Sequence, residues 1–202
     1  LVTYSGNAGR AHTFSSVLSA ARELASDNDV VFLFIGGGAR FEELRSAARD
    51  SGLANMRFLG YVPRDQLRYS LSAASVSLVT ENPEVSGLLV PSKTYGILAS
   101  GRPVIYVGPD NSDVAQIIHD YDCGVVVSPD DPAALVAAIR KFRSDAAYRE
   151  RLGRNARSAA ETVFDRSIAA AQWSEKLAQL RAPQQRKHAA REQIAAGAGS
   201  SI

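Results

Sequence analysis

Residues 91–109, PSKTYGILASGRPVIYVGP, contain one complete helix-to-strand unit. Pro91 suits the first turn of a helix, because the N–H that proline lacks would be unpaired there. Gly101 can end that helix, and Pro103 opens the β-branched run that follows. A stretch that was only a polar loop would not place its residues in this order. The segment therefore indicates a helix over 92–100 followed by a buried strand over 103–108.

The same unit recurs along the whole chain. Five other runs are short, rich in β-branched or aromatic residues and almost continuously hydrophobic, which is typical of strands buried on both faces. These runs are residues 1–6, 30–38, 56–62, 76–80 and 124–129. The segments between and after them have helical periodicity: 13–26, 39–52, 64–74, 112–121 and 132–145. Strict alternation predicts an α/β fold, a doubly wound parallel sheet with helices on both faces and ligands at the carboxyl ends of its strands.

The alternation stops near residue 144. We predict a Rossmann-like domain over 1–144 and C-terminal helices of the same domain over 145–180. Residues 181–202 lose the large apolar side chains and end in Gly and Ser, so we predict a mobile tail there. Because LVTYSG reads as a strand already under way, we expect the chain to be cut from a longer protein.

Composition excludes several classes of function. A formal net charge of +2 and basic residues spread without interleaved aromatics argue against nucleic acid as a partner. One cysteine and three scattered histidines leave no disulfide framework and no metal-ligand spacing, so we expect no metal. The lone Cys123 also favours a reducing compartment, and we expect a cytoplasmic protein.

The loop after the first strand, SGNAGRAH, suits a phosphate. Gly6 and Gly9 allow close backbone approach, Asn7 can cap or donate, and Arg10 and His12 are expected to add positive charge before a helix begins. Helix N-terminal amides and a guanidinium both favour an anion. The alternative is an ordinary glycine-rich turn with a solvated arginine.

Two further loops follow strands. Gly36 and Gly37 end the second strand without the spacing of a dinucleotide fingerprint, so they form either a tight turn or a loop that a ligand can approach closely. Tyr61 and Val62 leave backbone groups free at the end of the third strand, where a flat nucleobase could lie.

The loop after the fourth strand carries Glu81 and Glu84 and leads to Ser92 and Lys93 at the start of a helix. A cation is normally disfavoured in a first helical turn, so Lys93 there suggests a bound anion. The hypothesis is a phosphate clamp that Arg10 completes from across the cleft. The alternative is a surface lysine whose stem lies along apolar surface.

Five motifs in order, YSGNAGRAH, FIGGGARFEEL, MRFLGYVPRDQL, GLLVPSKTYGILASGRPVIYVG and CGVVVSPDDPAALVAAI, resemble one family. They are similar to the donor-binding carboxyl-terminal domain of GT-B glycosyltransferases of family 4 (group 1), of the colanic-acid and O-antigen type. The resemblance covers residues 1 to 180 and implies the Rossmann-like half of a GT-B fold.

The resemblance also implies roles for individual residues. The loop at Gly6, Asn7 and Arg10 would meet the donor diphosphate, and backbone groups of Tyr61 and Val62 would hold the base. Relatives carry two glutamates eight positions apart. The second falls here on Gly96, which cannot contact a ribose through a carboxylate. Glu84 or Glu81 is the candidate to replace the first on the donor sugar, and Glu84 is preferred.

The resemblance implies that the chain binds a nucleotide-sugar, a UDP-sugar, for a retaining hexosyltransferase of surface polysaccharide or glycolipid biosynthesis. No cofactor or metal is implied. A preceding domain would bind a sugar or lipid-linked acceptor, so the chain alone would be inactive, and the whole enzyme would be cytoplasmic or peripheral to the membrane. The alternatives are a UDP-sugar epimerase half-domain and a non-catalytic nucleotide-binding module.

Overall fold

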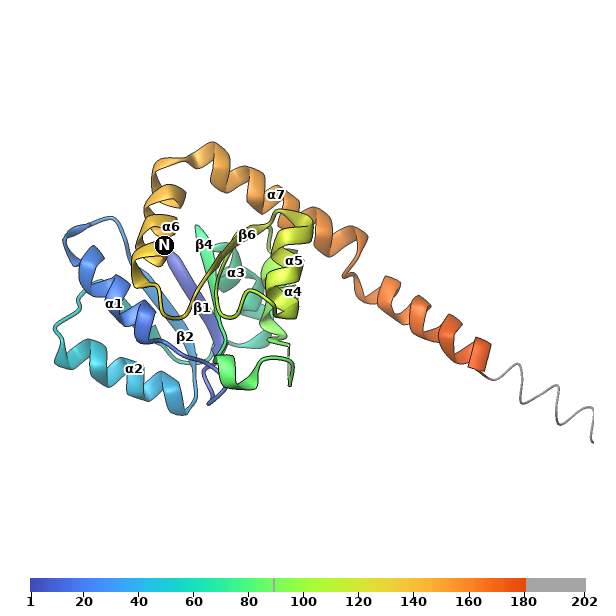
Figure 1. Ribbon diagram of the computed structural model, residues 1–202, viewed down its shortest axis with the longest axis horizontal. Coiled ribbons are helices and arrows are strands. Elements are labelled where there is room, and N and C mark those ends of the chain that lie inside the picture. Colours follow the sequence, from blue (N-terminus) through green and yellow to red (C-terminus); the bar gives the residue numbers. More distant parts are fainter. Residues whose placement is uncertain (89, 181–202) are drawn as a thin grey trace, which may run out of the picture. The chain divides into compact units, whose positions relative to one another are not determined.

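Six parallel strands form one sheet in the computed structural model, which describes residues 1–88 and 90–180 (Figure 1). Their order across the sheet is β3-β2-β1-β4-β5-β6. The strands are β1 (Val2–Asn7), β2 (Phe32–Gly37), β3 (Met56–Leu59), β4 (Val76–Thr80), β5 (Val104–Val107) and β6 (Gly124–Val127). Every strand predicted from the sequence is present, and all the pairings are parallel, so the predicted doubly wound sheet is confirmed.

Helices cover both faces of this sheet. Helix α1 contacts α2 and α6 on one face, whereas α3, α4 and α5 pack against β1, β4 and β5 from the other (Figure 1). The helices are α1 (Ser15–Glu23), α2 (Ala39–Asp50), α3 (Leu67–Ser72), α4 (Lys93–Ala99), α5 (Asp113–Tyr121), α6 (Pro132–Ser144) and α7 (Ala146–Thr162). Short 3-10 turns lie at Leu24–Ser26, Arg64–Gln66 and Pro83–Val85. The two apolar layers between sheet and helices supply the burial that stabilises the fold.

Aromatic side chains fill the layer beneath α1 and α2. The ring of Tyr4 lies edge-on to Phe14, with centroids 5.1 Å apart, and Phe34 stacks on Phe58 at 5.2 Å. β1 and β2 are buried because helices cover both faces, as their continuous hydrophobicity predicted. The same prediction is wrong for β3, because β3 lies at the edge of the sheet and exposes Arg57 and Leu59. Packing of this kind fixes the end of β1 firmly, and β1 ends at the candidate site.

The chain divides into two compact units, Leu1–Glu161 and Thr162–Ile202. In the described part of the second unit, residues 166–180 are helical. The prediction that residues 145–180 belong to the first domain stays a prediction, and the predicted mobile tail over 181–202 lies outside the described residues. Within residues 1–88 and 90–180, no helix has the length and apolar character needed to cross a membrane.

The strand order creates a crevice between β1 and β4. The chain leaves β1 toward α1 on one face and leaves β4 toward α4 on the other, so the two loops diverge. Ligands of open α/β sheets bind at the carboxyl ends of the strands at such a switch point. The loops that follow β1 and β4 are therefore the place to look for a site.

Candidate functional site

Lys93, the first residue of α4, reaches across the crevice to the end of β1. Its Nζ donates to the Tyr4 hydroxyl, lies 3.4 Å from the Asn7 carbonyl oxygen and 3.2 Å from His12 Nε2. The ammonium also sits 3.9 Å from the centre of the Tyr4 ring. All these partners are neutral, so the positive charge of Lys93 has no counter-ion among them. The side chain thus points into the crevice and not out along the surface.

His12 is part of this cluster and is neutral. Its Nδ1 lies 2.6 Å from the Thr80 carbonyl oxygen, so Nδ1–H donates there and Nε2 accepts from Lys93. Burial and the charge of Lys93 lower the pKa of His12 to about 4, although the bond to Thr80 opposes the shift. The expectation that His12 adds positive charge to the loop is therefore wrong, because its ring is buried beside an ammonium.

Burial also lowers the pKa of Lys93 to about 7. Near neutral pH the ligand-free chain would therefore hold Lys93 partly charged. An anion placed beside Nζ would favour the ammonium and raise this pKa. Binding of an anion at this point should therefore be accompanied by proton uptake.

The lowered pKa of Lys93 predicts that the free energy of unfolding rises with pH. An unfolded lysine keeps its ordinary value of 10.5, so between pH 7 and about 10 the unfolded chain binds a proton that the folded chain lacks. Raising the pH through this window should increase the free energy of unfolding, and Lys93→Met should remove about 1 to 3 kcal/mol of that increase. Urea unfolding of the unmodified chain and of Lys93→Met between pH 7 and 9.5 measures how the free energy of unfolding of each depends on pH. Parallel pH dependences would show that Lys93 is not desolvated.

Packing requires one of the predicted glycines, Gly36, and leaves little room at another, Gly37. Gly36 has a φ of +136°, and a Cβ there would lie 2.1 Å from the Gly6 carbonyl oxygen. A Cβ on Gly37 would lie 3.0 Å from the Tyr61 ring, which is 66% exposed and rests against this glycine. Close packing of β1 on β2 accounts for Gly36, whereas the exposed Tyr61 ring could move away from a side chain at position 37. Contact of either glycine with a donor stays a prediction.

The other predicted residues are placed around the crevice but are not all brought together. Gly6 lies beside the stem of Lys93, because a Cβ there would be 3.5 Å from Lys93 Cε. Arg10 is exposed and makes no ion pair with a described residue, so its role in a clamp with Lys93 stays a prediction. Ser92 is exposed just before α4, and Val62 is half-buried after Tyr61.

Glu84 is exposed on the loop that follows β4. Its backbone N–H donates to Asn82 Oδ1 at 3.2 Å, and Asn82 Nδ2 donates to Glu84 Oε2 at the same distance. These contacts hold the start of the loop in a turn and leave the carboxylate toward solvent. Contact between Glu84 and a donor sugar stays a prediction.

Glu81 differs from Glu84, and the sequence does not distinguish them. Its side chain is 1% exposed, and Oε2 accepts from the Tyr106 hydroxyl at 2.8 Å. Ser112, which caps α5, donates to the same hydroxyl at 2.8 Å. Oε1 has no hydrogen-bond partner in the described part of the chain. Glu81 thus ties the end of β4 to the start of α5 and does not face the crevice as a free acid.

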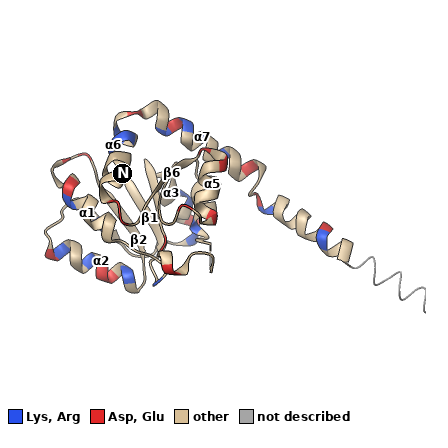
Figure 2. Cartoon of the chain, viewed as in Figure 1, with Lys and Arg blue, Asp and Glu red and all other residues tan. Residues whose placement is uncertain are grey.

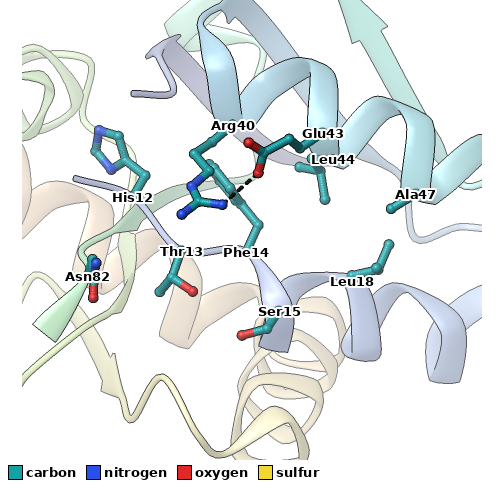
Figure 3. Close-up of a pocket in the computed structure, with 10 residues that line it drawn as sticks. All are labelled: His12, Thr13, Phe14, Ser15, Leu18, Arg40, Glu43, Leu44, Ala47 and Asn82. Atoms are coloured by element: carbon teal, nitrogen blue, oxygen red, sulfur yellow. Dashed lines mark hydrogen bonds and ion pairs between the residues drawn. The ribbon is translucent and has the colours of Figure 1, made fainter. Parts of the chain in front are cut away.

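A cavity of about 300 Å³ adjoins this cluster between the first turn of α1 and the facing side of α2 (Figure 3). The Arg40 guanidinium lies at its wall and donates to Glu43 Oε2 at 2.6 Å. Thr13, Ser15 and Asn82 supply polar groups, and His12 borders both this cavity and Lys93. The site therefore offers one half-buried cation at the end of β1 with a polar hollow beside it.

The site has no evident metal-binding set. Within residues 1–88 and 90–180, no three or more His, Cys, Asp or Glu side chains gather closely enough to hold a metal ion. The chemistry available near β1 is that of a lysine, backbone amides, hydroxyls and an arginine. Such groups suit the binding of an anion.

Comparison with known proteins gives a family. The model described as glycosyl transferases group 1 matches residues 1–159. A Pseudomonas aeruginosa protein named "Probable glycosyltransferase WbjE" is 33% identical over 134 residues, covering 66% of this chain and 33% of that protein. WcaI of Escherichia coli strain K12, named for colanic acid biosynthesis, is 30% identical over 142 residues, covering 70% and 35%. The chain spans about a third of the length of these curated relatives.

Solved structures give the same fold. Anabaena HepE in complex with UDP-glucose has a TM-score of 0.71 at 19% identity, covering 88% of this chain and 48% of HepE. Sucrose-phosphate synthase from Thermosynechococcus elongatus has a TM-score of 0.70 at 25% identity, covering 90% and 46%. The expected fold, the Rossmann-like half of a GT-B architecture, is confirmed.

Proposed function

Because the chain belongs to the group 1 glycosyl transferase family, we propose that it is the donor-binding domain of a retaining glycosyltransferase that uses a UDP-sugar. The observation that carries the proposal is Lys93. Its ammonium lies at the carboxyl end of β1 among neutral partners, beside the backbone of Gly6 and Asn7. A diphosphate in the crevice would supply the counter-ion that this lysine lacks.

The proposed placement of the donor follows from this contact. The diphosphate lies over Gly6 and Asn7, within reach of Lys93, and the exposed Arg10 adds a second cation. The base lies along the backbone of Tyr61 and Val62 at the end of β3. HepE is named as a complex with UDP-glucose, which supports a uridine nucleotide as the ligand of this domain.

Lys93 would act on the leaving group. When the glycosidic bond to the donor sugar breaks, negative charge develops on the diphosphate, and a positioned cation stabilises that charge. Anion binding also favours the charged form of Lys93, so the lysine would be fully protonated when it is needed. Glu84 is the proposed contact to the donor sugar from the loop after β4.

We also propose how the whole enzyme works, beyond the domain described above. An additional domain would bind a sugar or lipid-linked acceptor, and the chain without it would bind a donor but not transfer it. The names of WcaI and of WaaG, a glycosyltransferase involved in lipopolysaccharide biosynthesis, support a role in surface polysaccharide or glycolipid synthesis. The whole enzyme would then act in the cytoplasm against the membrane surface, without a metal cofactor.

Titration calorimetry with the 202-residue chain tests the proposed ligand. We expect UDP to bind more tightly than GDP or ADP, because the base would be recognised by backbone groups near Tyr61 while the diphosphate contacts are common to all three. The measurement is made at fixed ionic strength, since phosphate contacts weaken with salt. Absence of binding by all three nucleotides at millimolar concentration would overturn the proposed site.

A further inference from the structure

A second cavity, lined by several arginines, lies at the opposite end of the sheet from the candidate donor site. It has a volume of about 390 Å³ and is bordered by residues that precede β4 and β5 and by one side of α7. Four arginines line it, Arg102, Arg149, Arg154 and Arg157, against a single acid, Glu150. Figure 2 colours the basic residues of α7 blue. The strand ends here are amino ends, so this cavity is separate from the crevice that holds Lys93.

Two glycines bring the arginines together. A Cβ on Gly153 would lie 2.6 Å from the Gly101 carbonyl oxygen, so α7 packs backbone to backbone on the turn before β5. Residues four apart share one side of a helix, which places Arg149 and Arg157 on either side of Gly153. Arg102 follows Gly101 in the turn and so meets the arginines of α7.

The charges of this cluster are mostly not neutralised. Arg102 donates to the Ser72 carbonyl and Arg149 to the Phe142 carbonyl, both neutral acceptors. Arg157 donates to the Ala99 carbonyl and pairs with Glu161. Arg154 is exposed and forms no hydrogen bond or ion pair with a described residue. Arg151, one turn away, is by contrast paired with Asp122.

Arginines that are held by neutral carbonyls beside one another repel, and an anion would relieve that repulsion. The fork of a guanidinium matches phosphate oxygens geometrically, and several guanidiniums together select for a multiply charged group. We propose that this cavity is a binding site for a phosphate group, with Arg154 as the contact that is free to turn toward it. The phosphate belongs either to a soluble phosphate or diphosphate or to the headgroup of an anionic phospholipid. This inference does not rest on the proposed glycosyl transfer.

The test is an NMR titration of the 202-residue chain with pyrophosphate, which reads out the amide resonances of Gly101 and Gly153. We expect saturable shifts of both resonances, with sodium chloride at equal ionic strength as the reference. Arg154→Gln should weaken the affinity about threefold to fivefold, the range for an exposed charge contact, and Arg154→Glu should weaken it further. Arg45→Gln on α2 removes the same charge outside the cavity and should change nothing.

A second measurement, co-sedimentation with lipid vesicles, identifies the source of the phosphate. Co-sedimentation with phosphatidylglycerol but not phosphatidylcholine vesicles, lost in Arg154→Glu, would assign the cavity to a lipid headgroup. Pyrophosphate binding without sedimentation would assign it to a soluble anion. The proposal is overturned if the Gly101 and Gly153 resonances do not respond and no vesicle binds, or if Arg45→Gln weakens binding as much as Arg154→Gln. UDP binding at the other end of the sheet should be the same in all these variants.

Discussion

Lys93→Met should weaken binding of a UDP-sugar by about tenfold to a hundredfold. A hydrogen bond from a charged donor contributes about 1.5 to 3 kcal/mol, and 1.4 kcal/mol corresponds to a factor of ten in affinity. Methionine keeps much of the stem that packs beside Gly6 and removes only the ammonium. The affinity is measured by calorimetry with UDP-glucose, because the terminal phosphate of UDP itself titrates near pH 6.

The pH dependence of the same titration separates a charge effect from a packing effect. Because the pKa of the free Lys93 lies near 7, UDP-glucose affinity of the unmodified chain should fall as pH rises from 7 to 9. Binding at pH 7.5 should take up protons, which buffers of different ionisation enthalpy reveal. In Lys93→Met both effects should vanish. The control is Lys141→Met, which loses an exposed lysine paired with Asp145 and should bind normally.

Unchanged UDP-glucose affinity in Lys93→Met would contradict the role of Lys93. The lysine would then be a structural residue that ties α4 to β1 through Tyr4 and the Asn7 carbonyl. A loss of affinity with no pH dependence would instead indicate that the ammonium is solvated in the free chain. Proton uptake therefore tests the burial, and the change in affinity tests the contact.

The architecture was predictable because its signal is local and repeated. Each buried strand is a short hydrophobic run, and some helices are bounded by residues such as Pro91 and Gly101 that favour a helix start or end. Because the connections between parallel strands are right-handed, this alternation of strands and helices favours a doubly wound parallel sheet. The strand order β3-β2-β1-β4-β5-β6 was not predicted; the structure supplies it, and it locates the crevice between β1 and β4.

The site was predictable only in part, because its contacts join residues far apart in sequence. The sequence singled out Lys93 because a cation is disfavoured in the first turn of a helix. Its partners Tyr4 and His12 could not be predicted, because they lie far away in the sequence, on the other side of the crevice. His12 was expected to be charged because the sequence does not show that the ring is buried. Glu81 and Glu84 look alike in the sequence, yet one is buried against Tyr106 and the other faces solvent.

The arginine cavity, too, could be predicted only in part from the sequence. The four-residue spacing of Arg149, Gly153 and Arg157 is visible in the sequence, but an arginine-rich helix usually has a solvated face. Only the contact between Gly153 and Gly101 shows that Arg102 joins them. A glycine in the middle of a helix was the available signal, since such a glycine costs stability unless something packs closely against it.

Gly36→Ala should lower the free energy of unfolding by about 3 to 5 kcal/mol. The new Cβ would lie 2.1 Å from the Gly6 carbonyl oxygen, and neither backbone can move without separating β1 from β2. The φ of +136° adds strain that any L side chain would share. Gly60→Ala is the matched control: nothing lies within 4 Å of its Cβ, so its effect should stay within about 0.5 kcal/mol. Urea unfolding measures both, and equal midpoints for the two variants would mean that β1 and β2 are not packed as closely as the structure shows.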